Sequence, residues 1–156
     1  MEISLAPGPA GTRIAGLGHA QPLRVMDNHE HEGMMDTSDE WIRQRTGIVT
    51  RRIAAEGETV VDLAVPAARM ALADSGVAAT DIDLVVVATT TAAERSPNTA
   101  GRVAAALDLG RDGRGPAIMD VNTACSGFEY ALGVADQAIR SGSATNGVVV
   151  GAETLS

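Results

Sequence analysis

The sequence predicts an α/β fold with a mostly parallel sheet, because strand patterns alternate along the chain with amphipathic helix patterns. Two continuous apolar runs, IDLVVVAT (82–89) and GVVVGAE (147–153), are typical of strands that are covered on both faces. A third strand is predicted over AIMDV (117–121). The helices expected between these strands would supply the right-handed crossovers that parallel strands require.

The N-terminal part of the chain predicts a strand and a short helix. The run TRIAGLG (12–18) has the pattern of a short strand. Thr37 and Glu40 have the spacing of a capping box, in which each side chain satisfies a free backbone N–H at a helix start. We therefore expect a helix over 38–46, with Gly47 as its C-cap.

Three further helices are expected downstream. Apolar positions in 58–76 follow a helical period, but Pro66 lies inside the pattern and should kink or restart the helix. Another helix is expected to begin near Pro97, since proline suits a first-turn position, and to run to about Leu109. The last helix is predicted over 126–141.

The helix predicted over 126–141 carries more apolar surface than packing on one sheet requires. Its apolar positions cover an arc of about 200°, roughly twice the stripe that one buried face needs. A second layer of protein is therefore expected over this helix. No repeat or linker interrupts residues 12–156, which we expect to form one unit behind a flexible, Pro- and Gly-containing lead-in over 1–11.

Composition restricts the classes of function. A formal net charge of −8 argues against nucleic acid or an anionic membrane surface as a partner, and one Trp, one Tyr and one Phe leave little for base stacking. A single cysteine excludes an internal disulfide framework and fits a reducing compartment. The N-terminus lacks the order of a signal peptide, and no stretch approaches the roughly 18 apolar residues of a membrane span. A cytoplasmic protein is expected.

The candidate catalytic residue is Cys125, the only cysteine, within DVNTACSGFEY (120–130). Because a lone cysteine is most often a small buried hydrophobe, a structural role is the first alternative. Cys125, however, falls where a strand gives way to a helix, and helix starts favour a thiolate over a thiol. A thiolate there can attack a thioester carbonyl and hold the acyl group covalently. The junction alone leaves both alternatives open.

Five segments together resemble β-ketoacyl-acyl carrier protein synthase III, the initiating condensing enzyme of the thiolase fold. In chain order they are DTSDEWI (36–42), RTGI (45–48), VVVATTT (85–91), DVNTACSGFEYAL (120–132) and VVVGAETLS (148–156). The similarity covers nearly everything from Thr12 onward. It implies that residues 12–156 are the N-terminal half of a thiolase-like fold, that the C-terminal half is absent from this chain, and that the cysteine helix is buried between the two halves.

The resemblance also implies a reaction and its site residues. Cys125 would take an acyl primer from acyl-coenzyme A, and malonyl-acyl carrier protein would then be decarboxylated and condensed onto it. Trp41 would stack on the coenzyme A adenine, with Arg45 and Thr46 as neighbouring contacts. Without the resemblance, Trp41 would be expected to pack under a loop. Acyl-coenzyme A is a substrate, no cofactor or metal ion is implied, and a homodimer through strand 117–121 is expected.

Two departures from the family pattern affect these expectations. Family members complete the active site with a histidine and an asparagine from the second half, whereas the histidines here, at 19, 29 and 31, match neither position. Many members also carry a bulky aromatic before Pro97, which crosses the dimer interface and limits the acyl pocket. Here Ser96 takes that place and predicts a roomier pocket for longer or branched primers.

Two alternative functions remain open. The chain could belong to a thiolase-fold acyltransferase that acylates an oxygen or nitrogen of a natural product without condensation. It could also be an incomplete, non-catalytic subunit that needs a partner chain. The pair His29 and His31 suggests a metal site, but no convincing third and fourth ligands accompany it, so a solvated loop or helix end is expected there.

Overall fold

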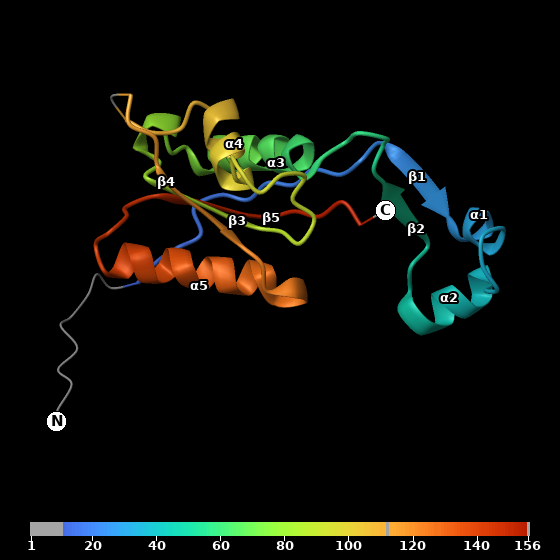
Figure 1. The fold of residues 1–156 in the computed structure, drawn as a ribbon. Helices are drawn as coiled ribbons and strands as arrows, with labels where there is room; N and C mark the ends of the chain where they lie inside the picture. The colour runs from blue at the N-terminus through green and yellow to red at the C-terminus, as the bar shows by residue number, and fades with distance from the viewer. Residues whose placement is uncertain (1–10, 112, 156) are drawn as a thin grey trace. The chain divides into compact units, whose positions relative to one another are not determined.

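The computed structural model describes residues 11–111 and 113–155, which form two compact units (Figure 1). Among the described residues, the first unit contains 11–20 and Thr59–Glu153, and the second contains Gln21–Glu58 with the last residues of the chain. Nearly all of the lead-in predicted over 1–11 lies outside the described residues. No helix of the described residues is long and apolar enough to cross a membrane.

The first unit confirms the predicted parallel sheet. Its three strands, β3 (Leu84–Ala88), β4 (Ala117–Val121) and β5 (Gly147–Gly151), lie in the order β4-β3-β5, and both pairings are parallel. Every residue of the central strand β3 is buried, as the continuous apolar run predicted. β5 ends at Gly151, two residues earlier than predicted.

Helices cover both faces of this sheet (Figure 1). Helices α3 (Val60–Ser75) and α4 (Thr99–Ala106) share one apolar core with Val85 and Val87 of β3. Helix α5 (Gly127–Arg140) packs on the opposite face, where Ala131 and Ala135 meet Val86. The alternation of side chains along β3 therefore divides the core into two layers.

Helix α3 is a single helix that passes through Pro66, so of the predicted kink or restart, the restart is wrong. Thr59 and Asp62 form a capping box at its start, and Gly76 adopts a left-handed conformation (φ 68°) at its end. Pro66 is exposed, while Ala64 and Ala68 on either side are buried against the sheet. Packing on both sides of the proline maintains the helix despite one missing N–H donor.

Helix α4 begins at Thr99, so the prediction that Pro97 occupies its first turn is also wrong. The start is set by acceptors rather than by the proline. The Asp120 carboxylate on β4 accepts hydrogen bonds from the backbone N–H groups of Thr99 and Ala100, at 2.8 Å each, and Asn98 Oδ1 accepts from Gly101 N at 3.0 Å. The helix ends at Ala106, three residues before the predicted end.

Residues 12–18 do not form the predicted strand. The segment instead lies against α3. A Cβ on Gly18 would be 2.1 Å from the carbonyl oxygen of Ala67, and the Asp74 carboxylate accepts a hydrogen bond from Leu17 N at 2.9 Å. A cavity of about 430 Å³ is lined by this segment, α3, α5 and β5. Among the described residues, β5 lies at an edge of the sheet and pairs only with β3.

The second unit is a small antiparallel pair with two short helices. Its elements are β1 (Arg24–Asp27), α1 (Asn28–Glu32), α2 (Asp39–Thr46) and β2 (Thr50–Ile53). Helix α2 confirms the predicted helix, and Gly47 caps it in a left-handed conformation (φ 73°). The predicted capping box is wrong by one residue, because Ser38 is the N-cap and accepts a hydrogen bond from Trp41 N at 3.1 Å.

Replacing Asp120 with Ala is expected to lower the free energy of unfolding by about 1–3 kcal/mol, because two N–H groups at the start of α4 lose their acceptor. Asp120→Asn keeps one carbonyl oxygen and should have a smaller effect. Urea unfolding of the three proteins measures the difference. Equal urea midpoints for Asp120→Ala and the unchanged protein would contradict this account of the helix start.

Candidate active site

Cys125 lies at the carboxyl end of the parallel sheet, at the predicted junction between strand and helix. Strand β4 ends at Val121, and Cys125 is the middle residue of a single 3₁₀ turn, η2 (Ala124–Ser126), that leads directly into α5. Its side chain is exposed and forms no disulfide. Among the described residues, Cys125 belongs to neither of the two clusters of buried apolar residues.

Small residues allow α5 to begin close to the ends of the strands. Gly127, the first residue of α5, is buried, and a Cβ there would lie 3.1 Å from the Cβ of Ala88 at the end of β3. A Cβ on Gly151 would lie 3.1 Å from the ring of Phe128. The helix that follows Cys125 therefore starts close against the ends of β3 and β5, where a side chain at either glycine would force a neighbouring group to shift.

One face of α5 is open in the first unit. Ala131 and Ala135 are buried against the sheet, whereas Phe128 is 45% exposed and Tyr130 is 61% exposed. The sheet therefore covers only part of the broad apolar arc that the sequence predicts for this helix. The second layer expected over this helix stays a prediction.

Glu153 and three threonines, which were not among the predicted site residues, form a polar cluster at the same edge of the sheet. The Glu153 carboxylate accepts hydrogen bonds from Thr90 N (2.7 Å), from Thr90 Oγ1 (3.0 Å) and from Thr91 Oγ1 (2.5 Å). Thr89 Oγ1 lies 3.4 Å from the same carboxylate. Glu153 follows β5 and the threonines follow β3, so this carboxylate joins the ends of two neighbouring strands.

The environment of Glu153 favours its charged form. Burial raises the pKa of this carboxyl, but the hydrogen bonds from Thr91 and Thr90 together outweigh burial and lower the pKa below its ordinary value. The sequence did contain a signal for this cluster. Polar residues that directly follow parallel strands meet at one edge of a sheet, and the motifs VVVATTT and VVVGAE both end in this way.

Ser96 is exposed and precedes α4 by three residues. The start of α4 is bonded to Asp120 of β4, the same strand that leads to Cys125. The structure therefore ties the segment that carries Ser96 and the turn that carries Cys125 to the carboxyl end of one strand.

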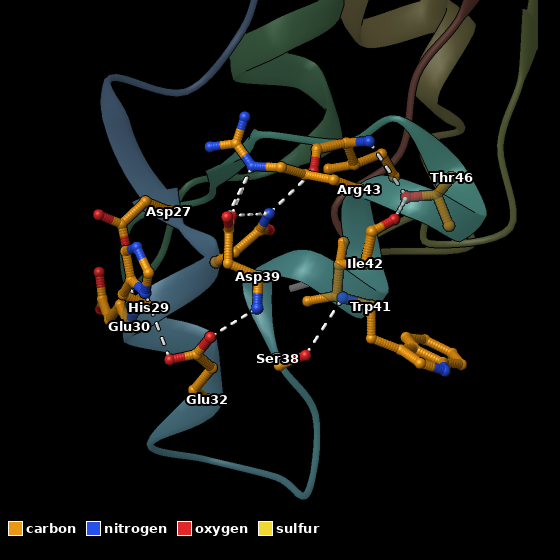
Figure 2. Close-up of polar contacts among 12 residues, drawn as sticks. Asp27, His29, Glu30, Glu32, Ser38, Asp39, Trp41, Ile42, Arg43 and Thr46 are labelled. Atoms are coloured by element: carbon orange, nitrogen blue, oxygen red, sulfur yellow. Dashed lines mark hydrogen bonds and ion pairs between the residues drawn. The ribbon is translucent and has the colours of Figure 1, made fainter.

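The three residues proposed for coenzyme A lie together on α2 in the second unit. Trp41 is 55% exposed, so it does not pack under a loop, and Figure 2 shows its indole pointing away from the polar contacts of Asp39 and Arg43. The guanidinium carbon of Arg45 lies 5.9 Å from the centre of the indole ring. Thr46 Oγ1 donates to the carbonyl oxygen of Ile42 at 2.8 Å and accepts from Ile48 N at 3.1 Å.

A polar network surrounds the start of α2 (Figure 2). Arg43 Nε donates to both oxygens of Asp39 at 2.7 Å, and Glu32 Oε1 accepts from Asp39 N at 2.5 Å. The hydrogen bond from Arg43, and next that from Asn28, lower the pKa of Asp39. The hydrogen bond to Glu32 raises the pKa of His29, whose Nδ1 lies 3.3 Å from the Glu32 carboxylate.

His29 and His31 belong to α1, a five-residue helix, which agrees with the helix end expected there. Among the described residues, no group of three or more His, Cys, Asp or Glu side chains is arranged to hold a metal ion.

Comparison with known proteins identifies the family. A model of the family 3-oxoacyl-[acyl-carrier-protein] synthase III matches residues 119–156, which include Cys125. Over 146 residues, or 94% of this chain, the sequence is 55% identical to β-ketoacyl-[acyl-carrier-protein] synthase III 4 of Streptomyces coelicolor. The chain belongs to the synthase III family. It covers 45% of that relative, so the chain spans about half the length of the curated relatives it matches.

Solved structures confirm the thiolase-like fold of this synthase III half. The crystal structure of 3-oxoacyl-[acyl-carrier-protein] synthase III from Aquifex aeolicus VF5 superposes with a TM-score of 0.86 at 46% identity, over 93% of this chain and 46% of that one. The priming β-ketosynthase of a polyketide biosynthetic pathway superposes with a TM-score of 0.87 at 36% identity, over 99% of this chain and 45% of that one.

The polar cluster around Glu153 predicts that the stability of this synthase III chain depends on pH. The pKa of Glu153 is lower in the folded state, so its ionised form stabilises that state, and the contribution is present at neutral pH and lost as the pH falls through the range in which this carboxyl titrates. Glu153→Gln should therefore lower the free energy of unfolding at neutral pH, by about 1 kcal/mol because the site is partly exposed to water.

The difference between the two proteins is expected to shrink on acidification. Urea unfolding in steps from neutral pH to about pH 3 measures it. A difference that stays constant or grows as the pH falls would contradict the role given to the ionised carboxylate.

Proposed function

We propose that Cys125 is the acyl-accepting nucleophile of a β-ketoacyl-acyl carrier protein synthase III that initiates fatty-acid or polyketide synthesis. One observation carries the proposal. The only cysteine of the chain is exposed at the carboxyl end of a parallel sheet, where a strand gives way to a helix, inside the residues that the family model matches. Catalytic side chains in open α/β sheets gather at this edge.

In the first step the Cys125 thiolate attacks the thioester carbonyl of an acyl-coenzyme A. The bond between the carbonyl carbon and the coenzyme A sulfur breaks, coenzyme A leaves as a thiolate that takes up a proton, and the acyl group stays on Sγ. Backbone N–H groups at the start of a helix are suited to stabilise the oxyanion that forms on the carbonyl oxygen.

In the second step malonyl-acyl carrier protein condenses with the acyl-cysteine. Loss of CO₂ leaves a carbanion at the malonyl C2, this carbon attacks the acyl carbonyl, and Cys125 Sγ leaves as the thiolate. The product is a 3-oxoacyl-acyl carrier protein. In this proposal the histidine and asparagine that promote decarboxylation come from the other half of the enzyme, because this chain matches about half of its relatives.

Trp41, Arg45 and Thr46 are proposed to bind the coenzyme A nucleotide. The exposed indole offers a face for the adenine, and the neighbouring guanidinium offers charge for a phosphate.

No further cofactor is proposed, and the single cysteine supports a cytoplasmic enzyme. A homodimer through β4 is supported by its position at the edge of the sheet, with Ile118 and Met119 exposed.

Acylation of Cys125 can be measured directly. The gene product that carries this sequence is incubated with an acyl-coenzyme A and its intact mass is determined under denaturing conditions. One acyl group per chain is expected, and Cys125→Ala should abolish the gain, whereas the neighbouring Ser126→Ala should retain it. An unchanged mass for the native protein would contradict the proposal.

The product separates condensation from simple acyl transfer. With malonyl-acyl carrier protein present, release of CO₂ and a 3-oxoacyl product are expected. Transfer of the acyl group to another acceptor without loss of CO₂ would instead support an acyltransferase that keeps the same cysteine.

Ser96 is proposed to leave space for longer or branched primers. Ser96→Phe should lower kcat/KM for a longer acyl-coenzyme A by at least about tenfold, with a smaller effect on acetyl-coenzyme A, because a bulky ring removes pocket volume. Ser96→Ala adds no bulk and serves as the control. Strict acetyl preference in the unchanged enzyme, or equal losses for both primers in Ser96→Phe, would contradict this role.

A further inference from the structure

Helix α2 needs support from outside itself to hold Trp41, Arg45 and Thr46 in place. It has eight residues, and isolated helices of this length are not stable in water. Only Ile42 of this helix is buried. Apolar packing on one side chain does not fix both ends of a helix, so polar contacts at the two ends decide how the helix is held.

A single buried amide contacts both ends of α2. Asn28 is 1% exposed, and its Nδ2 donates to Asp39 Oδ1 at 2.8 Å and to the carbonyl oxygen of Ile48 at 2.9 Å. Asp39 is the first residue of α2, and Ile48 is the second residue after its last. The Oδ1 atom of Asn28 accepts a hydrogen bond from Arg51 of β2 at 2.7 Å. Both amide protons and the carbonyl oxygen are therefore in use.

The contact at the C-terminal end leads directly to Thr46. Ile48 is held at both of its backbone groups: its carbonyl oxygen accepts a hydrogen bond from Asn28, and its N–H donates to Thr46 Oγ1. At the N-terminal end, Asp39 lies two residues before Trp41. Loss of the Asn28 side chain would therefore remove one contact at each end of the helix and is expected to loosen the residues proposed to contact coenzyme A.

We infer that Asn28 is a positioning residue for recognition of the nucleotide part of coenzyme A, acting through both ends of α2. The inference rests on the proposed function of Trp41, Arg45 and Thr46. Asn28 touches no reacting group. Its effect is on how well the enzyme distinguishes a thioester that carries the nucleotide from one that lacks it.

The test compares two substrates in the gene product that carries this sequence. Acetyl-coenzyme A has the nucleotide, whereas acetyl-pantetheine has the same thioester without it. The unchanged protein should prefer acetyl-coenzyme A. Asn28→Ala is expected to reduce this preference, measured as the ratio of the two kcat/KM values, by about tenfold or more, mainly through KM for acetyl-coenzyme A. The activity with acetyl-pantetheine should change little.

A matched control lies on the same helix. Gln44→Ala also removes an amide, but Gln44 is exposed and its amide donates to the neighbouring Glu40 on the same helix, so the ratio should stay unchanged. Asn28→Asp keeps the shape but places a carboxylate against the Asp39 carboxylate and the Ile48 carbonyl, and it should reduce the ratio at least as much as Asn28→Ala. Adding Asp39→Asn restores a donor between the two side chains and should recover part of the loss.

The outcomes separate this inference from the proposed function. If the unchanged protein uses both substrates equally well, α2 does not bind the nucleotide and the proposed coenzyme A site fails. If the unchanged protein prefers acetyl-coenzyme A and Asn28→Ala keeps that preference, only the role of Asn28 is overturned. Equal losses with both substrates would also overturn it, because they indicate general destabilisation. Where Asn28→Ala does not fold, Asn28→Ser, which can serve one helix end at a time, gives the same comparison.

Discussion

The central strand β3 is the constraint on which the first unit depends. All five of its residues are buried, so both faces of the sheet must be covered, by α3 and α4 on one side and by α5 on the other. Parallel pairing on both edges of β3 then brings the ends of all three strands to one side of the sheet. Cys125 lies at that side because the strand before it is paired in register with β3, and its position is set by the whole sheet rather than by its own turn.

Small side chains make this arrangement compact. The buried core residues of α5 are Ala131 and Ala135, with Val134, Ala138 and Ile139 packed beside them, and its first residue is Gly127, close to Ala88. A helix that contacts a sheet through alanines lies closer to it than one that contacts through leucines, and close packing restores the dispersion energy that small side chains lack. The direct pairing of β3 with β5 brings the end of β5 next to the loop after β3, where Glu153 accepts hydrogen bonds from Thr90 and Thr91.

The elements that were predicted correctly have patterns that local physics decides. The β-branched run of β3 and the left-handed glycine after α2 depend on a few neighbouring residues, and both were found where expected. The errors at residues 12–18 and at Pro97 have the opposite origin. The first segment has a strand pattern but is held on α3, and the start of α4 is fixed by Asp120, which lies more than twenty residues later. Polar residues after β3 and β5 can be seen in the sequence, but the pairing of Glu153 with Thr90 and Thr91 depends on the two strands lying side by side.

The second unit holds its candidate site residues on α2 in place without a hydrophobic core as large as that of the first unit. Its buried apolar side chains are Met26 and Ile42 among the described residues, so hydrogen bonds must define the geometry that packing defines around Cys125. A buried polar group stabilises only when all of its partners are present. At the position of Asn28 a donor is needed toward Asp39 and Ile48 and an acceptor toward Arg51. A carboxylate has no donor and an ammonium has no acceptor, so a neutral amide is the side chain whose chemistry fits all three.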